Sequence, residues 1–361
     1  MKKLLISLSF VVIICNLTTA QNVVIPDTLF KNYLLTDTLI NTNGDGEISF
    51  AEAAAYQDTI SLSHYHLTSL DGIEAFINIT GLNCEGDCCG GGGVIRNLNV
   101  SNCTKLRFIN CSNNKLNTLD VSNDTALVEL DCNKNNISHL NVSANKALVV
   151  LQCYTDSISS LDVSQNTLLK VLWCNNNQLS NLDVSNNTAL ADIDCDNNLL
   201  TGLDVSHNPA LESFMCFNNQ LASLDVTNNP LLTFLFCHNN PYLTTICVSS
   251  VSNAVAQEAN SNYLKDDSAA WSETCAIGIQ STKNNSTIDV FPNPSSGLFT
   301  ISGADKESSI AIYNSTGALL FTANSIDLTQ KIDLSKYAKG IYWYTVSTQN
   351  SQLKSGKIIV Q

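Results

Sequence analysis

The chain has 361 residues, with 18 Lys and Arg against 32 Asp and Glu and a formal net charge of −14 at pH 7. This charge repels phosphate backbones, so it argues against nucleic acid as a partner. With 44% hydrophobic and 14% charged residues, the composition also differs from that of a disordered tail. No Lys or Arg lies between Lys170 and Lys265, so a partner of this stretch should be neutral, cationic or bridged by a cation.

Residues 1–20 have the pattern of a secretory signal peptide. Two lysines precede an apolar run that ends at Ile14, and small residues end at Ala20. We expect this segment to be removed and the mature chain to be exported. The alternative, a lipidated Cys15, is disfavoured because Ile14 stands where lipoprotein signals use a small residue. No apolar run reaches the roughly 18 residues of a membrane span, so no transmembrane segment is expected.

Residues 21–59 are expected to form a small helical cap around a loop that matches the calcium loop of an EF-hand. Helices are expected over residues 27–35 and 50–57. The loop has oxygen-bearing side chains at positions 1, 3 and 5, Gly46 at position 6 and Glu at position 12. Because Asn replaces the usual Asp at position 1, we expect one low-affinity Ca²⁺ site. The alternative is a turn that caps the next segment without metal. The expected ligands are Asn41, Asn43, Asp45, Glu47 and Glu52.

The middle of the chain repeats every 21 residues. Each repeat has the pattern L-x-x-L-x-C-x-x-N-x-L, followed by L-D-V-S-x-N. The alternation of inward and outward residues predicts one short strand per repeat, parallel to the next strand. Stacked repeats then share one apolar core, as in a solenoid. The cysteines in this register are Cys111, Cys132, Cys153, Cys174, Cys195, Cys216 and Cys237.

These repeats resemble leucine-rich repeats, in a form similar to the bacterial subclass called IRREKO. The resemblance covers residues 60–247 and implies a mainly β solenoid. The repeated Cys is expected to be a buried thiol, because neighbours on parallel strands lie about 4.8 Å apart and a disulfide prefers about 3.8 Å between Cβ atoms. The repeated Asn is expected to satisfy backbone groups at the turns, with Asp156 interrupting its column.

Residues 248–275 are expected to cap the end of the solenoid. Cys247 and Cys275 flank this segment, and the resemblance implies a disulfide between them, as in many leucine-rich repeat proteins. A glycine-rich bulge near the start of the repeats contains two further cysteines, and either one is a candidate to bridge to the next repeat. The cysteines whose pairing the spacing leaves open are Cys84, Cys88, Cys89 and Cys103.

The outward positions of the predicted strands form a concave strand face that is polar in the early repeats and aromatic in the late ones. An exposed aromatic patch usually marks a contact surface. This one suits an extracellular protein segment or a glycan stacked on aromatic rings. The alternative is that the aromatic residues cover the solenoid end or pack on the cap. The expected ligand-binding residues are Tyr154, Trp173, Asp192, Asp194, Asp196, Met215, Phe217, Phe234, Phe236 and His238.

Catalytic patterns are missing from the sequence. The five histidines are scattered, and neither G-x-S-x-G nor H-E-x-x-H occurs. We therefore expect a binding protein and not an enzyme. A structural surface spacer without a dedicated ligand remains the other class of function.

After a polar linker at residues 276–288, residues 289–361 read as short strands separated by turns, which predicts a small β-sandwich. This segment resembles the type A sorting domain of the type IX secretion system of Bacteroidetes. The resemblance implies a tag that the secretion machinery recognises after passage through the periplasm, and therefore a cell-surface or extracellular location. The alternative is a sandwich that binds a ligand. The residues that carry the sorting motif include Pro292, Asn293, Pro294, Gly297, Gly317, Gly340 and Lys357.

Overall fold

The computed structural model describes residues 21–63, 65–87, 93–274, 289–302, 308–314, 318–324, 329–347 and 352–361. The predicted signal peptide, the whole linker at residues 276–288, and Cys88, Cys89, Cys275 and Gly317 lie outside these residues. The chain divides into two compact units, Met1–Glu273 and Thr274–Gln361, which are described separately.

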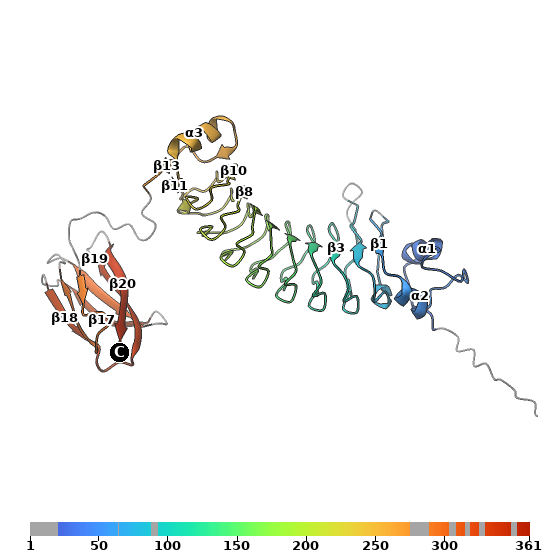
Figure 1. Ribbon diagram of the computed structural model, residues 1–361, viewed down its shortest axis with the longest axis horizontal. Helices are drawn as coiled ribbons and strands as arrows, with labels where there is room; N and C mark the ends of the chain where they lie inside the picture. The colour runs from blue at the N-terminus through green and yellow to red at the C-terminus, as the bar shows by residue number, and fades with distance from the viewer. Residues whose placement is uncertain are drawn as a thin grey trace, which may run out of the picture. The chain divides into compact units, whose positions relative to one another are not determined.

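The first unit is a solenoid whose coils follow one another from the N-terminal helices to α3, with the strands on one side (Figure 1). Its ten-stranded sheet is parallel where the pairing is defined, and repeating strands lie 21 residues apart: Ile109 pairs with Leu130, which pairs with Leu151. This confirms the predicted solenoid. The strands, in spatial order, are β1 (Thr59–Ser61), β2 (Gly81–Asn83), β3 (Phe108–Asn110), β4 (Glu129–Asp131), β5 (Val150–Gln152), β6 (Val171–Trp173), β7 (Asp192–Asp194), β8 (Ser213–Met215), β10 (Phe234–Phe236) and β12 (Tyr263–Leu264).

A second, smaller parallel sheet lies in the C-terminal coils. It contains β9 (Leu224–Asp225), β11 (Thr245–Cys247) and β13 (Ala270–Ser272), in the order β13-β11-β9. The other coils pass through this side as irregular backbone within the described residues. The second half of the repeat therefore stays close to an extended path without forming a continuous ladder.

The core of the solenoid contains the repeated apolar residues and the cysteines. Leu106, Ile109 and Cys111 are each 0% exposed, and the equivalent residues of the next coils are equally buried. The column of cysteines consists of free thiols, and burial raises their pKa, to about 12 for Cys84. This confirms the expected buried thiols. Cys103 is also a free buried thiol, so a bridge from the glycine-rich bulge to it is not formed.

Two columns of Asn side chains connect successive coils. In the predicted column, Asn177 Nδ2 donates to the carbonyl of Cys153 in the previous coil at 2.8 Å, and its Oδ1 accepts the Ile158 N–H at 2.9 Å. A second column on the other half of the coil was not predicted. There Asn187 Nδ2 donates to Val163 O at 2.9 Å and to Asn166 O at 2.8 Å. The amides thus replace strand hydrogen bonds at the turns.

Short helices and loops cover the N-terminal end of the solenoid. Helix α1 (Thr28–Thr36) is capped by Asp27, whose Oδ1 accepts the N–H groups of Leu29 and Phe30. The other oxygen of Asp27 accepts the N–H and hydroxyl of Thr68, both at 2.7 Å, so this carboxylate joins the cap to the first coils. Helix α2 (Phe50–Ala55) and the 3₁₀ turn η1 (Ile73–Ala75) complete this end.

At the C-terminal end, helix α3 (Val251–Ala259) is followed by β12 and β13, each of which extends one of the two sheets. Tyr263 of β12 donates from its hydroxyl to Leu232 O at 2.9 Å. The cap therefore adds the tenth strand to the main sheet.

The second unit is built from antiparallel strands, as predicted for the tail. A core of apolar residues that includes Phe299, Ile312 and Tyr344 lies in this unit. No helix in the described parts of the chain is long and apolar enough to cross a membrane. One sheet contains β14 (Asp289–Phe291), β15 (Leu298–Ser302) and β18 (Thr329–Asp333), and the other contains β17 (Leu319–Asn324), β16 (Ser309–Tyr313), β19 (Gly340–Ser347) and β20 (Gln352–Val360).

Candidate binding face

The outward side chains of the main sheet form the strand face, and the register of the strands aligns them in columns. Trp173 lies beside Asp194, which lies beside Met215 and then Phe236. A neighbouring column contains Asp192, Ser213 and Phe234, and Phe234 is 46% exposed. The period of two along each short strand explains this arrangement, since the residue between the two outward positions is buried. The third column, two residues past the strands, contains Tyr154, Asp196, Phe217 and His238.

Aromatic rings on this face contact one another between coils. The rings of Tyr154 and Trp173 have centroids 6.4 Å apart, and those of Phe217 and His238 are stacked at 4.8 Å with an interplanar angle of 5°. The ammonium of Lys134 lies 5.8 Å from the centre of the Tyr154 ring. These contacts keep flat apolar surfaces in defined orientations along several coils.

Three carboxylates lie among the aromatic side chains. Trp173 Nε1 donates to Asp192 Oδ2 at 3.1 Å, which fixes the indole against the next coil. Burial, together with the neighbouring Asp196 and Asp192, raises the pKa of Asp194 to about 7. Asp196 itself is 5% exposed. This part of the face thus gathers three acidic side chains with little water around them, and the raised pKa means that Asp194 loses its proton only near neutral pH.

The cap contacts one edge of this aromatic cluster. Strand β12 pairs with β10 so that Leu264 lies next to Phe236. The cap therefore accounts for part of the surroundings of Phe236, in agreement with the alternative that late aromatic residues pack on the cap. Phe234 precedes the two paired residues of β10, and Trp173 on β6 is separated from β10 by β7 and β8.

The structure adds one residue to the face that the sequence analysis did not select. Asp131 on β4 lies beside Gln152, and burial raises its pKa to about 6. Asp131 lies in the same outward column as Trp173, so the alternation along the strands could have identified it. It was not selected because its neighbours in the early repeats are polar.

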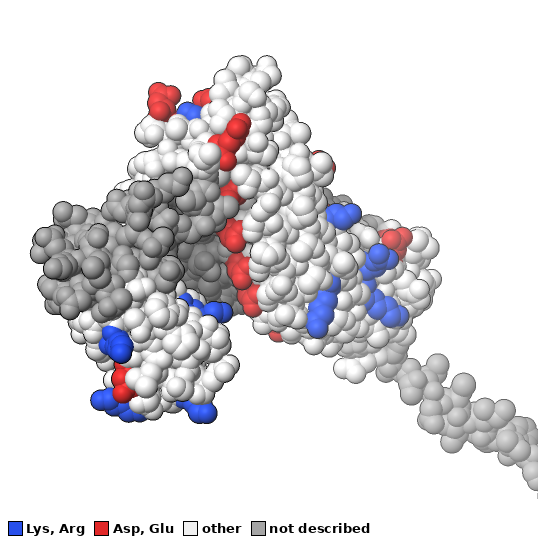
Figure 2. All heavy atoms as spheres, turned by 60° about the vertical axis from the view of Figure 1, so that its left-hand side comes forward, with Lys and Arg blue, Asp and Glu red and all other residues white. Residues whose placement is uncertain are grey.

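A line of acidic side chains also runs along one side of the solenoid (Figure 2). The repeated L-D-V-S segments supply an exposed Asp in most coils, with Asn141 in its place in one of them, and these carboxylates have a structural role. Asp183 Oδ1 accepts the N–H of Ser185 at 2.9 Å, and the hydrogen bonds from Ser185 lower the pKa of Asp183. The same contact recurs at Asp162 and Asp204.

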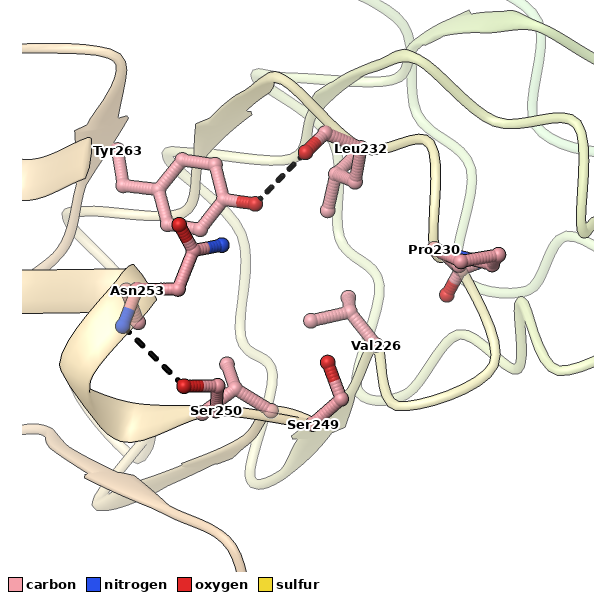
Figure 3. Close-up of a pocket in the computed structure, with 10 residues that line it drawn as sticks. Val226, Pro230, Leu232, Ser249, Ser250, Asn253 and Tyr263 are labelled. Carbon is pink, nitrogen blue, oxygen red and sulfur yellow. Dashed lines mark hydrogen bonds between the residues drawn. The ribbon is translucent and has the colours of Figure 1, made fainter. Parts of the chain in front are cut away.

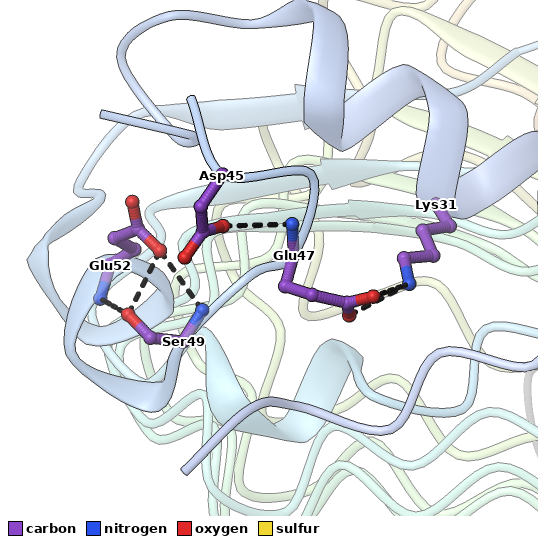
Figure 4. A network of polar contacts seen from close by, with 5 residues as sticks. All are labelled: Lys31, Asp45, Glu47, Ser49 and Glu52. Atoms are coloured by element: carbon purple, nitrogen blue, oxygen red, sulfur yellow. Dashed lines mark hydrogen bonds and ion pairs between the residues drawn. The ribbon is translucent and has the colours of Figure 1, made fainter. Parts of the chain in front are cut away.

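The predicted calcium loop connects α1 and α2 (Figure 4), and its side chains bond within the cap. Both oxygens of Glu52 accept hydrogen bonds, including the Thr42 N–H at 3.0 Å and the Ser49 N–H at 3.0 Å. Glu47 forms an ion pair with Lys31 at 2.7 Å. Gly46 has φ 82°, the backbone conformation that its loop position requires. Among the described residues, no group of three or more His, Cys, Asp or Glu is arranged to hold a metal ion.

A small pocket lies between the last coil and the C-terminal cap (Figure 3). Its lining includes Val226, Pro230 and Ser249, and the Asn253 N–H donates to Ser250 Oγ at its edge at 3.3 Å. The pocket is a packing gap at the base of α3, and none of the predicted binding residues lines it.

In the tail, several residues of the predicted sorting motif hold the last strand. Asn293 Nδ2 donates to Lys357 O at 2.7 Å, and Asn293 Oδ1 accepts the Ile359 N–H at 2.9 Å. Gly297 has φ 105°, and a Cβ at this position would lie 2.6 Å from Ser335 Cα. The other residues of the motif that the structure describes are Pro292, Pro294 and Gly340.

Comparisons with known proteins identify the tail. Residues 289–361 match the family described as Secretion system C-terminal sorting domain. No curated protein matches the chain.

Solved structures that resemble the chain include leucine-rich repeat proteins. The functional domain of InlJ from Listeria monocytogenes, which includes a cysteine ladder, aligns at 19% identity over 94% of this chain and 98% of its own, with a TM-score of 0.36. The internalin InlF from Listeria monocytogenes aligns at 16% identity over 72% of this chain and 99% of its own, with a TM-score of 0.40. A leucine-rich repeat protein from Leptospira interrogans aligns at 17% identity over 60% of this chain and 62% of its own, with a TM-score of 0.46.

The fold assignment rests on the 21-residue register and the strand pairing in this structure, and the location rests on the tail. A leucine-rich repeat solenoid joined to a sorting tail fits a protein without enzymatic activity. The sorting domain indicates export to the cell surface or the extracellular space. The chain is thus a secreted leucine-rich repeat protein whose residues 289–361 belong to the secretion system C-terminal sorting domain family.

Proposed function

We propose that this protein binds an extracellular protein or glycan partner through the strand face, in the manner of an adhesin. The observation that supports this most is that Trp173 on β6 and the 46% exposed Phe234 on β10 present aromatic surface on the outward side of one sheet, with β7 and β8 between them. Exposed aromatic residues next to polar groups are enriched at sites of recognition. The sheet supports them because each strand is fixed by its two neighbours.

The test is binding of the full chain to arrays of extracellular proteins and glycans. The variant Trp173→Ala/Phe234→Ala removes the two aromatic anchors, and Leu168→Ala/Tyr242→Ala removes exposed apolar side chains away from the strands, which are 55% and 64% exposed. We expect a ligand whose binding is lost in the first variant and kept in the second. If neither variant changes binding, or no ligand is found, the alternative of a structural surface spacer is favoured.

Calcium binding by the N-terminal loop is a second part of the proposal. The helix-loop-helix order and Gly46 support it, and so does an antiparallel contact in which Val23 N–H donates to Ile48 O at 2.8 Å and Phe50 N–H to Gln21 O at 3.0 Å. The N-terminal residues therefore lie beside the end of the loop as a neighbouring strand, which a single EF-hand otherwise lacks. A dissociation constant of about 10⁻⁴–10⁻³ M, as in extracellular calcium modules, is expected.

Thermal unfolding with and without Ca²⁺ tests this second part. We expect millimolar-range calcium to raise the melting temperature of the full chain but not that of Asp45→Asn. The control Asp71→Asn removes an exposed carboxylate outside the loop and should keep the response. If wild type and Asp45→Asn respond alike, the loop is a metal-free cap.

The cap at the other end is proposed to be closed by a Cys247–Cys275 disulfide. Cys247 is 7% exposed at the end of β11 and is not among the free thiols of the described residues. Peptide mapping of the unreduced, secreted protein should recover one peptide pair containing both cysteines. A free thiol at Cys247 in the secreted protein would refute the pair.

A further inference from the structure

Two carboxylates of β7 have the same orientation on the strand face. Asp192 and Asp194 are alternate residues of one strand, with the buried Ile193 between them. Alternate residues of an extended strand lie about 6.6 Å apart, so their carboxylates form a row rather than a single cluster. The 5% exposed Asp196 continues this row beneath the surface.

No ion pair among the described residues involves this row. Asp192 Oδ1 is buried and accepts no hydrogen bond within the described part of the chain. The sequence supplies no Lys or Arg between Lys170 and Lys265. The ion pairs that the structure does show are Lys31–Glu47, His66–Asp87 and Lys265–Glu258.

An aromatic and an apolar side chain border Asp194 on its two sides, whereas Asp192 lies between Val171 and Ser213. Trp173 lies beside Asp194 on β6, and its indole donates to Asp192. On the other side the neighbours of Asp192 and Asp194 are Ser213 and Met215. Carboxylates bordered by an aromatic face suit a guanidinium or ammonium group, which pairs with the carboxylate and stacks on the ring.

We propose that the strand face at β6 to β8 binds an extended protein segment with Arg or Lys at alternate positions. This inference rests on the proposed function and names the chemistry of the partner. Alternate residues of an extended segment project to one side at the same spacing of about 6.6 Å as the two carboxylates. Charge complementarity between the row and the segment then fixes the register of the bound chain. A single metal ion fits less well, because the carboxylates are spread along the strand.

The test uses two labelled peptides of one composition and the full chain. The first peptide alternates arginine with serine, and the second has the same arginines in one block. Fluorescence anisotropy at physiological salt should show tighter binding of the alternating peptide. The variant Asp192→Asn/Asp194→Asn should weaken it by about tenfold. The control Asp162→Asn/Asp183→Asn makes the same change in net charge on the other half of the coil.

The outcomes separate the inference from the proposed function. Equal weakening by the two variants would mean attraction by net charge alone and would overturn the inference. Equal affinity for the two peptides would overturn it as well. Suppose that a ligand found on the arrays loses binding in Trp173→Ala/Phe234→Ala but keeps it in Asp192→Asn/Asp194→Asn. The proposed function would then stand, and the inference that the partner is a cationic segment would be refuted. Unfolding of each variant, measured in parallel, excludes loss of structure as the cause.

Discussion

Asp124 provides a quantitative test of how the coils are held together. It occupies the first position of the second Asn column, is 0% exposed, and neither carboxylate oxygen has a hydrogen-bond partner in the described structure. In the five following coils the Asn at this position donates from Nδ2 to two backbone carbonyls of the previous coil at 2.8–3.0 Å. A carboxylate cannot donate these bonds, so the charge is buried without compensation.

The variant Asp124→Asn should therefore stabilise the solenoid. Burial, with the nearby Asp120, raises the pKa of Asp124 from 3.8 to about 7. A shift of roughly three units corresponds to at most about 4 kcal/mol of stability lost above pH 7 in wild type. The introduced amide adds about 1 kcal/mol for each hydrogen bond that it forms. Allowing for relaxation around the site, we expect a gain of about 2–4 kcal/mol at pH 8.

The pH dependence has a defined sign. The folded state holds the proton of Asp124 up to about pH 7, whereas the unfolded chain releases it near pH 3.8. The contribution of this group thus lowers the free energy of unfolding of wild type as the pH rises from about 4 to about 7. The gain from Asp124→Asn should shrink to about 1 kcal/mol at the acidic end, where the neutral carboxyl can itself donate one bond.

Urea unfolding at several pH values measures this effect. Of the three tryptophans, Trp343 lies in the tail, so a Trp343→Phe background restricts the fluorescence signal to Trp173 and Trp271 of the solenoid. Asp162→Asn is the matched control, because its carboxylate is exposed, hydrogen bonds from Ser164 lower its pKa, and it is not among the groups that act on Asp124. If Asp124→Asn leaves the free energy of unfolding unchanged or lowers it at pH 8, the role assigned to the Asn column is wrong.

Three further substitutions test other parts of the structure. Asn187→Ala leaves the carbonyls of the previous coil without their amide donor and should cost about 2–3 kcal/mol in the same urea assay, whereas no loss would show that water replaces the amide. Thr155 has φ 56° at a turn where most coils have Asn, so Thr155→Asn should stabilise by about 1 kcal/mol, and a loss of stability would contradict this. Gly297→Ala places a methyl group against Ser335 at φ 105° and should lower the melting temperature of the tail and the secreted fraction of the protein; unchanged secretion with an unchanged tail would refute the steric argument.

The solenoid was predictable because its information is local and repeated. The step of 21 residues fixes which residues point inward, and the structure confirms the register strand by strand, as between Leu130 and Leu151. The second Asn column was visible in the repeat pattern, but its role depends on carbonyl groups one coil away. The positive φ at positions such as Asn176 likewise follows from a turn geometry that periodicity alone does not specify.

The ends of the solenoid were harder to predict, since their contacts join segments far apart in the sequence. Tyr263 reaches Leu232, and Asp27 reaches Thr68. Neither contact has a periodic signature. The pairing of β12 with β10 depends on the path of the chain after α3. Because the cap occurs only once, no repeat in the sequence indicates this path.

The candidate binding face was predictable in outline. Alternation placed Trp173, Asp194 and Met215 in one column, and the structure aligns them in that order. The hydrogen bond from Trp173 to Asp192 and the raised pKa of Asp194 depend on side-chain orientation and burial, which the sequence pattern does not contain. The outward residues were therefore predictable, but the orientation of the indole and the protonation of the carboxyl required the structure.

Recognition through the strand face is the central claim, and the ratio of two dissociation constants tests it most directly. A ligand found with the full chain is titrated against Trp173→Ala/Phe234→Ala and against Leu168→Ala/Tyr242→Ala. The account predicts at least about a tenfold weaker affinity for the first variant, because buried aromatic anchors dominate binding energy, and an unchanged affinity for the second. Equal affinities of the two variants for that ligand would place the binding site elsewhere and contradict the account.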